Sequence, residues 1–246
     1  MINIVIPMAG RGSRFTDVGY KLPKPLIDVS GRPMIEWVVE NISPSVPHKF
    51  IFIVQREHCE KYDLSNRLQA ISNNCEIVMI DGITEGAACT VLCAEKFINN
   101  GTPLMIANSD QWVDTSIDKY IQAWNMDEYL GHIMTMESDH PKWSYAKFNE
   151  SGAVIDVIEK VVVSDQATVG IYNFSSGSLF CKYANIMIEE NNRSKGEFYV
   201  APVYRYLIDS GEHVSLYSIG KDQGGMYGLG TPEDLDFFLK FKSAEV

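Results

Sequence analysis

The chain has 246 residues, a hydrophobic content of 46%, a charged content of 22% and a formal net charge of −11. This composition is that of an ordinary globular protein, and an acidic chain without a basic stretch is not expected to bind nucleic acid. No apolar stretch approaches the ~20 residues that span a bilayer, and no secretory signal is recognisable, so we expect a cytoplasmic protein without membrane insertion. The five scattered cysteines agree with a reducing compartment.

The first part of the chain alternates between two periodicities. Apolar runs of strand length lie at 2–6, 50–54, 76–80 and 103–107, and stretches with helical spacing lie between them at roughly 34–42, 58–72 and 87–98. Strands that alternate with helices predict a mostly parallel sheet with right-handed crossovers. Ligands of such sheets gather at the carboxyl ends of the strands.

After about residue 130 the pattern changes to closely spaced strands. We expect strands at 133–136, 146–148, 154–158 and 168–174, helices near 176–190 and 199–209, a strand at 214–219 and a last helix from Pro232. No linker or internal repeat interrupts the chain. The sequence therefore predicts one domain, 1–246, with a first half of residues 1–130 and a β-rich second half of residues 131–246.

A glycine-rich turn follows the first strand. Its sequence is Pro7-Met8-Ala9-Gly10-Arg11-Gly12-Ser13-Arg14-Phe15, and Lys24 lies between two prolines ten residues after Arg14. Glycines allow backbone N–H groups to surround an anion, and the three basic residues would form a cationic clamp on a stiff frame. The turn therefore suits a triphosphate.

Other motifs fit this turn less well. A dinucleotide-binding fingerprint needs a third glycine at the position of Phe15, and a P-loop needs a closing Gly-Lys-Ser/Thr. A glycosyltransferase would normally show an Asp-x-Asp metal motif, whereas Asp110 is followed by Gln111 and Trp112. A tight turn with solvated arginines would explain Arg11 alone. It does not explain why Arg14 and Lys24 occur together with Gly10, Gly12, Pro23 and Pro25.

Together with Pro23-Lys24-Pro25-Leu26 and Gly31-Arg32-Pro33-Met34-Ile35, the turn resembles the signature of the sugar-phosphate nucleotidyltransferases, or nucleoside-diphospho-sugar pyrophosphorylases. The short capsule-type cytidylyltransferase-like members resemble it most. The resemblance implies an α/β fold that is Rossmann-like and GT-A-like. Its mostly parallel mixed sheet would be flanked by helices, with a nucleotide-binding first half and a small β-rich acceptor subregion.

The resemblance also implies an activity. An NTP would react with a phosphorylated small-molecule acceptor, by default a sugar 1-phosphate, in a Mg²⁺-dependent step that releases pyrophosphate. The activated product would serve surface polysaccharide-type biosynthesis, such as that of a capsule. A phosphocholine-like or phosphorylated amino-acid-like acceptor, a catalytically silent nucleotide-sensing subunit and a homo-oligomer stay open.

The resemblance assigns roles to individual residues. Arg14 and Lys24 would stabilise the triphosphate during catalysis, and Asp110, at the end of the fourth strand, would hold Mg²⁺. Relatives commonly place a second metal-binding Asp two residues before a Gly-Thr, but that position is Gly228 here. Either Asp222 substitutes, or Asp110 holds the metal with phosphates and water alone, and we favour the second.

Nucleotide contacts are expected from the glycine-rich turn and from a second small-residue turn: Met8, Ala9, Gly10, Arg11, Gly12, Ser13, Asp81, Gly86 and Ala87. Thymidylyl- and uridylyl-transferring relatives often have Gln at the position of Asp81. An ionised carboxylate only accepts hydrogen bonds, which suits the amino groups of cytosine or guanine better than a carbonyl-rich base. The resemblance to short capsule-type cytidylyltransferases favours CTP. The other interpretation is that Asp81 and Gly82 form a common turn pair.

The acceptor is expected to contact six residues: Asn108, Tyr145, Glu159, Lys160, Gly170 and Glu197. In the family, the Lys of the Glu-Lys pair binds the acceptor's phosphate, which would attack the α-phosphorus of the nucleotide in line. That phosphate is already ionised near neutral pH, so the reaction needs no general base. None of the five histidines lies in a motif, in agreement with this mechanism.

Overall fold

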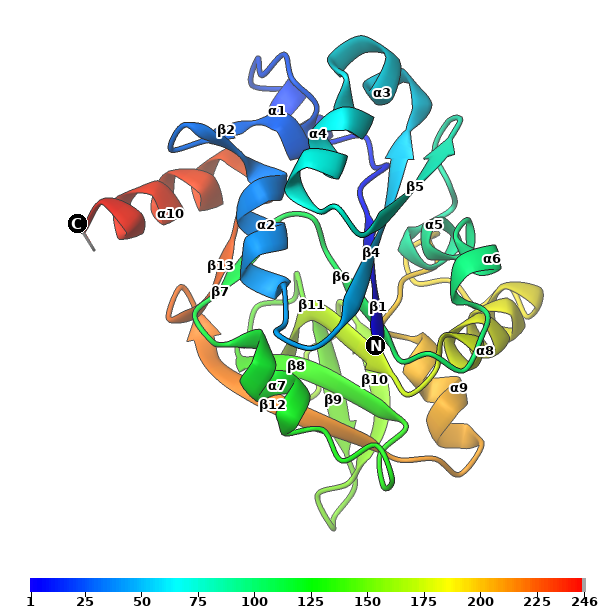
Figure 1. Ribbon diagram of the computed structural model, residues 1–246. Coiled ribbons are helices and arrows are strands. Elements are labelled where there is room, and N and C mark those ends of the chain that lie inside the picture. Colours follow the sequence, from blue (N-terminus) through cyan, green and yellow to red (C-terminus); the bar gives the residue numbers. More distant parts are fainter. Residues whose placement is uncertain (245–246) are drawn as a thin grey trace.

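A twisted sheet runs through the computed structural model, which describes residues 1–244, and helices lie on both of its sides (Figure 1). Within these residues the main sheet has eleven strands, in the order β5-β4-β1-β6-β11-β8-β12-β13-β7, with β9 beside β11 and β10 beside β9. The strands are β1 (Ile2–Pro7), β4 (His48–Gln55), β5 (Cys75–Ile80), β6 (Leu104–Ala107), β7 (Gln111–Val113), β8 (Gly131–Glu137), β9 (Ser144–Phe148), β10 (Val154–Glu159), β11 (Gln166–Phe174), β12 (Val214–Asp222) and β13 (Gly225–Gly228).

A small two-stranded sheet, β2 (Asp28–Val29) and β3 (Arg32–Pro33), lies apart from the main sheet. The helices are α1 (Ser13–Thr16), the 3-10 helix η1 (Lys24–Leu26), α2 (Met34–Ile42), α3 (Arg56–Tyr62), α4 (Leu64–Ile71), α5 (Ala87–Leu92), α6 (Glu95–Ile98), α7 (Ile117–Gln122), α8 (Gly177–Glu189), α9 (Val203–Asp209) and α10 (Pro232–Ala244). None of the described helices is long and apolar enough to cross a membrane.

Strand β1 is buried on both faces, and its sequence is apolar apart from Asn3, as expected for a strand within a parallel sheet. Ile4 and Ile6 pack into one hydrophobic cluster with residues of α2 and α4. Val5 packs into a second cluster with residues of α5, α8 and α9. Because β1 pairs in parallel with β4 and β6, the carboxyl ends of these strands meet at one edge of the sheet.

The two sequence halves share the sheet. Strand β6 of the first half pairs antiparallel with β11 of the second, with Ala107 opposite Ile171. The backbone N–H of Asn108 donates to the carbonyl oxygen of Gly170 at 3.0 Å and extends this contact. The predicted α/β fold class is confirmed, with a sheet that is parallel from β5 to β6 and mixed beyond.

The predicted elements differ from the observed ones at a few places. The helix expected at 58–72 is divided into α3 and α4, because Asp63 adopts a left-handed conformation with φ of 55°. The stretch 87–98 forms α5 and α6, and the helix expected at 199–209 begins at Val203. Strands β7 and β13 were not expected, because they are short and β13 contains two glycines. Their antiparallel pairing places Gln111 opposite Gly228.

Candidate active site

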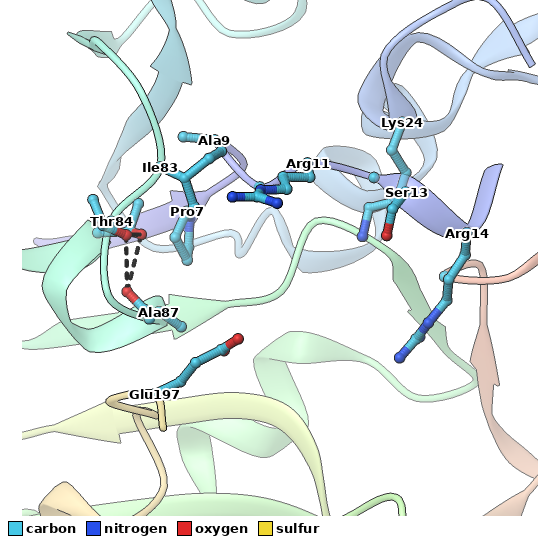
Figure 2. A pocket seen from close by; sticks show the side chains of 15 residues that line it. Pro7, Ala9, Arg11, Ser13, Arg14, Lys24, Ile83, Thr84, Ala87 and Glu197 are labelled. Atoms are coloured by element: carbon cyan, nitrogen blue, oxygen red, sulfur yellow. Dashed lines mark hydrogen bonds between the residues drawn. The ribbon is translucent and has the colours of Figure 1, made fainter. Parts of the chain in front are cut away.

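The glycine-rich turn forms one wall of a cavity of about 720 Å³. Residues Ala9 to Arg14 line it without a break, together with Lys24. Figure 2 shows the Arg11 and Arg14 side chains on this wall and Glu197 on the opposite one. Gly12 has a φ of 63°, and a Cβ at this position would lie 3.3 Å from Cβ of Lys24. Glycine therefore lets the loop approach the Lys24 segment closely.

The far end of this first cavity is built by the turn before α5. Ile83, Thr84, Gly86 and Ala87 line it. Gly86 has a φ of 137°, and a Cβ there would lie 2.4 Å from the carbonyl oxygen of Phe198. Glycine is required for this approach, which brings the neighbouring Glu197 into the first cavity. Glu197 was expected to contact the acceptor; it lines the first cavity, and its charge also acts on Glu159 and Lys160.

Two of the residues expected to bind the nucleotide lie elsewhere. Asp81 is exposed and outside the lining of the cavity, and its carboxylate accepts a hydrogen bond from Nε of Arg56 at 2.9 Å. Met8 is buried in the core beneath the loop, where its backbone N–H donates to the carbonyl oxygen of Ile53 at 2.9 Å. Neither side chain is placed to contact a nucleotide in this cavity.

Gln55, which the sequence did not single out, joins the two walls of the first cavity. Its Nε2 donates to the carbonyl oxygens of Ala9 and of Gly82, each at 2.6 Å. The amide at the end of β4 therefore holds the glycine-rich loop and the turn that contains Gly82 together. No motif in the sequence indicates this role, because the three residues are far apart along the chain.

Lys24 and Asp110 meet at the edge of the first cavity. Nζ of Lys24 donates to Oδ2 of Asp110 at 2.6 Å, and both side chains are about three-quarters buried, with exposed fractions of 23% and 25%. Asp110 follows β6, and its backbone carbonyl accepts a hydrogen bond from the N–H of Leu229 at 2.8 Å. A Cβ at Gly230 would lie 2.5 Å from Oδ2 of Asp110, so glycine leaves room for this carboxylate.

A second carboxylate, from Asp234, lines the same region. Asp234 lies in the first turn of α10, where its backbone N–H donates to Oγ1 of Thr231 at 3.1 Å. A Cβ at Gly228 would lie 3.2 Å from Oδ2 of Asp234, so the carboxylate lies against the position where relatives have an Asp side chain. Asp110 and Asp234 both line a second cavity of about 350 Å³.

The sequence did not indicate Asp234, because it lies outside the position at which the family has its second Asp. Asp222, the alternative ligand considered from the sequence, is held by Lys142, with Nζ and Oδ2 3.2 Å apart. It does not line the second cavity. Among residues 1–244 no cluster of three or more His, Cys, Asp or Glu side chains could hold a metal, so a metal here would need oxygen atoms from the substrates.

A third cavity, of about 250 Å³, contains four of the six predicted acceptor residues: Asn108, Glu159, Lys160 and Gly170. Gly170 has a φ of 84°, and a Cβ there would lie 2.2 Å from Nδ2 of Asn108. Glycine is thus required where the two halves meet. Aromatic walls are provided by Trp143, Tyr172 and Tyr199.

Glu159 and Lys160 are bound to neighbours inside this third cavity. The carboxylate of Glu159 accepts a hydrogen bond from the Ser144 hydroxyl, and burial raises the pKa of Glu159. Nζ of Lys160 donates to the Tyr199 hydroxyl and lies 3.7 Å from Oε1 of Glu159. Burial lowers the pKa of Lys160, but the Tyr199 hydrogen bond and the nearby carboxylates outweigh burial, so the net shift is upward.

Tyr145, also expected to bind the acceptor, is fully buried and lines none of the three cavities. Its hydroxyl donates to the carbonyl oxygen of His140 at 2.8 Å. The prediction is therefore wrong for a direct contact, because side chains alternate along β9 and Tyr145 points into the core. Its neighbour Ser144 faces the third cavity instead.

The three cavities adjoin one another. Arg14 and Gly230 line both the first and the second, whereas Asn108, Lys142 and Trp143 line both the second and the third. Lys142 and Trp143 were missed from the sequence, because they lie in an irregular loop between β8 and β9. The first cavity, which is large and cationic, is therefore followed by the second, which contains two carboxylates, and by the third, which is small and polar.

Comparison with known proteins agrees with this arrangement. A family model described as nucleotidyl transferase matches residues 4–226. The bifunctional protein GlmU of Streptococcus gordonii is 27% identical over 228 residues, covering 87% of this chain and 46% of GlmU. GlmU of Methanococcus maripaludis is 23% identical over 218 residues, covering 86% and 48%. The chain spans about half the length of these curated relatives.

Solved structures show the same fold. The nucleoside-diphosphate-sugar pyrophosphorylase of Vibrio cholerae RC9 matches with a TM-score of 0.80 at 24% identity, over 96% of this chain and 99% of that chain. The inositol-1-phosphate CTP transferase of T. maritima matches with a TM-score of 0.75 at 16% identity, over 99% and 96%. With the family match over residues 4–226, these findings show that the chain belongs to the nucleotidyl transferase family.

Proposed function

We propose that the protein transfers a nucleotidyl group from an NTP to a phosphorylated small molecule and releases pyrophosphate. The observation that supports this most directly is the Lys24–Asp110 pair, which lies where the large cationic cavity meets the carboxylate-lined one. A triphosphate on the glycine-rich loop would have its α-phosphate near this pair. An acceptor in the third cavity would approach from the opposite side.

In the proposed reaction, an oxygen of the acceptor's phosphate forms a bond to the α-phosphorus. The bond from that phosphorus to the oxygen that bridges to the β-phosphate breaks, and the electron pair leaves with pyrophosphate. Lys24 would neutralise charge on the α-phosphate, and Arg14 would bind the departing pyrophosphate. Positioning and charge neutralisation of this kind are the main contributions of proteins to phosphoryl transfer.

Mg²⁺ is part of this proposal, and the residues present fit it. Asp110 and Asp234 provide hard oxygen ligands, and the glycines at 230 and 228 leave space beside both carboxylates. Mg²⁺ in proteins often uses one or two carboxylates together with substrate phosphates. When bound, the ion would supply positive charge to the phosphates. In this proposal Asp234 is the second metal ligand. It replaces both alternatives considered from the sequence, which were Asp222 as second ligand and Asp110 as the only carboxylate.

We propose CTP as the first donor to test and a sugar 1-phosphate as the first acceptor. The choice of CTP now rests on the resemblance to short cytidylyltransferase-like proteins alone, because Asp81 lies outside the cavity. The polar groups of the third cavity, among them Ser144, Glu159 and Thr168, suit a hydroxylated acceptor. A product for surface polysaccharide synthesis, made in the cytoplasm, belongs to the same proposal.

Titration calorimetry of CTP, GTP, UTP, TTP and ATP with Mg²⁺ tests the proposal on the wild type and on Arg14→Ala. We expect one nucleotide to bind the wild type and to lose most of its affinity in the variant. Pyrophosphate release in the presence of candidate acceptors then identifies the second substrate. If no nucleotide binds the wild type, the proposed transfer is wrong.

A further inference from the structure

One carboxylate of the candidate metal site is bound to a cation of the protein itself. Nζ of Lys24 donates to Oδ2 of Asp110 at 2.6 Å, and both side chains are about three-quarters buried. Asp110 lines the second cavity beside Asp234, whereas Lys24 lines the first cavity, so the ion pair crosses the boundary between the two. The ammonium group therefore lies next to an oxygen that a metal ion would need.

Only the side chain of Lys24 can change partner, because its backbone is held in place. Lys24 begins the 3-10 helix η1, in which Pro25 and Leu26 are buried. The N–H of Ile27 donates to the carbonyl oxygen of Lys24 at 3.1 Å. Gly12 packs closely on Lys24, since a Cβ at Gly12 would lie 3.3 Å from Cβ of the lysine. The rest of the lysine side chain is flexible, and its ammonium group can turn its hydrogens toward any nearby acceptor.

A triphosphate would compete with Asp110 for this lysine. This step rests on the proposed function, in which Lys24 neutralises charge on the α-phosphate. The carboxylate has one negative charge and the triphosphate has several, and both accept charge-assisted hydrogen bonds. Arg11 and Arg14 line the same cavity (Figure 2), and within residues 1–244 neither forms an ion pair with a carboxylate. The arginines can therefore bind the nucleotide first, without breaking an existing contact.

When Lys24 turns to the phosphates, Asp110 loses its cation. Asp110 and Asp234 then lie beside the phosphates as two carboxylates, and neither has another ion-pair partner in the described part of the chain, 1–244. Carboxylates and phosphates placed side by side repel one another, most strongly where burial excludes water. The repulsion is relieved if the two carboxylates share a divalent cation with the phosphates. Loss of the lysine and binding of the cation are thus expected together.

Without a nucleotide, the same ion pair disfavours a metal ion. Over residues 1–244 no cluster of three or more His, Cys, Asp or Glu side chains could hold one, so Asp110 and Asp234 would have to bind it with water alone. The ion would also lie next to the ammonium group of Lys24, and two cations at one carboxylate repel each other.

We propose that Lys24 is an internal substitute for the metal ion. It neutralises Asp110 until a nucleotide binds, then moves to the α-phosphate and leaves Asp110 to a divalent cation. The protein alone therefore binds the divalent cation weakly, and the metal site is complete only when the nucleotide is present. Lys24 has two roles in succession, first at the carboxylate and then at the phosphate.

Mn²⁺ alone is the probe, and electron paramagnetic resonance of the unbound ion measures its affinity for the protein without nucleotide. We expect Lys24→Met and Lys24→Gln to strengthen Mn²⁺ binding about tenfold, because the competing positive charge is gone. Lys21→Met, which removes an exposed lysine and the same net charge, is the control and should leave the affinity within about twofold. Circular dichroism verifies that the variants are folded. A gain of less than about threefold in the folded Lys24 variants overturns the proposal.

Asp110→Asn locates the effect. The chain has a net charge of −11, so Mn²⁺ can also bind elsewhere on its surface. The gain from Lys24→Met should disappear when Asp110→Asn is combined with it, since the lysine then has no carboxylate for which to compete. A gain that persists in the double variant would place the ion elsewhere and overturn the proposal.

Nucleotide binding is measured separately by calorimetry on the wild type, so the two proposals can fail independently. If no nucleotide binds, the proposed transfer is wrong, whatever Mn²⁺ does. If a nucleotide binds and the Lys24 variants leave Mn²⁺ affinity unchanged, only the exchange between Lys24 and the metal ion is refuted.

Discussion

The two halves of the chain contribute to the site in different ways. In the first half, six consecutive residues from Ala9 to Arg14 line the first cavity, so one short segment provides one wall. In the second half, the third cavity takes residues from β9, β10 and β11, from the loop before β9 and from the segment 199–201. The division is also incomplete, because Glu197 lies in the first cavity and Asn108 in the third. A cavity wall formed by consecutive residues can be recognised in a sequence. A wall formed by residues from several strands and loops depends on the fold.

The largest effect on the reaction rate is expected at Lys24, which lines the first cavity beside the glycine-rich turn. Lys24→Ala removes the cation that pairs with Asp110 and should lower the rate of pyrophosphate release by ~10²–10³, as for other electrostatic groups in active sites. The fold should persist, because Lys24 lies at the cavity edge. Lys21→Ala, an exposed lysine three residues earlier, is the matched control. Near-wild-type turnover of Lys24→Ala, measured with the same acceptor, would contradict the role.

The second prediction concerns the contact between the halves. His132 of β8 is buried, and its ring is stacked on Tyr120 and Trp124 of the first half. Its Nε2 donates to the carbonyl oxygen of Tyr120 at 3.2 Å, and its Nδ1 accepts the Ser215 hydroxyl at 2.7 Å. Burial lowers the pKa of His132 to about 4. The ring is therefore neutral in the folded protein across the physiological range.

As the pH falls below ~6.5, the unfolded chain binds a proton at this histidine and the folded protein does not. The free energy of unfolding should therefore decrease between pH 6.5 and about 4, by roughly 3 kcal/mol from His132 when both states are compared below pH 4. Urea unfolding at several pH values measures this. The dependence should be weaker in His132→Gln and unchanged in the exposed control His213→Gln. Equal slopes in all three proteins would rule out the effect.

The contrast between the halves also explains what the sequence could predict. The α/β order and the glycine-rich turn depend on local pattern, since a strand, a turn and its basic residues are adjacent in the chain. Asp234 and Lys142 enter the site only through the long-range pairings of β13 with β7 and of β8 with β11 and β12. Asp81 lies outside the first cavity, because Arg56, 25 residues earlier in the chain, binds its carboxylate.

A smaller effect is expected at the proposed metal site, where the first half supplies Asp110 and the second Asp234. Asp234→Asn keeps the shape of the side chain and removes its charge. We expect Mg²⁺ affinity to fall about tenfold, at the lower end of what changes around metal sites cost. Mn²⁺ binding in the presence of the nucleotide and without an acceptor, followed by electron paramagnetic resonance, measures this without turnover. Asp222→Asn is the control, and an equal loss in both variants would mean that Asp234 has no special role.

The smallest effect is expected at Asp81, which the sequence placed on the base and the structure places outside the cavity. Its carboxylate is 75% exposed and faces Arg56, and exposed ion pairs contribute little to stability. Asp81→Ala should therefore leave nucleotide affinity and the preference among bases within about twofold of the wild type. Thr84→Val, whose side chain lines the cavity, should alter the affinity more. If Asp81→Ala instead changes the preferred base, the turn must rearrange when the nucleotide binds, and the first half too would then assemble its site from distant parts.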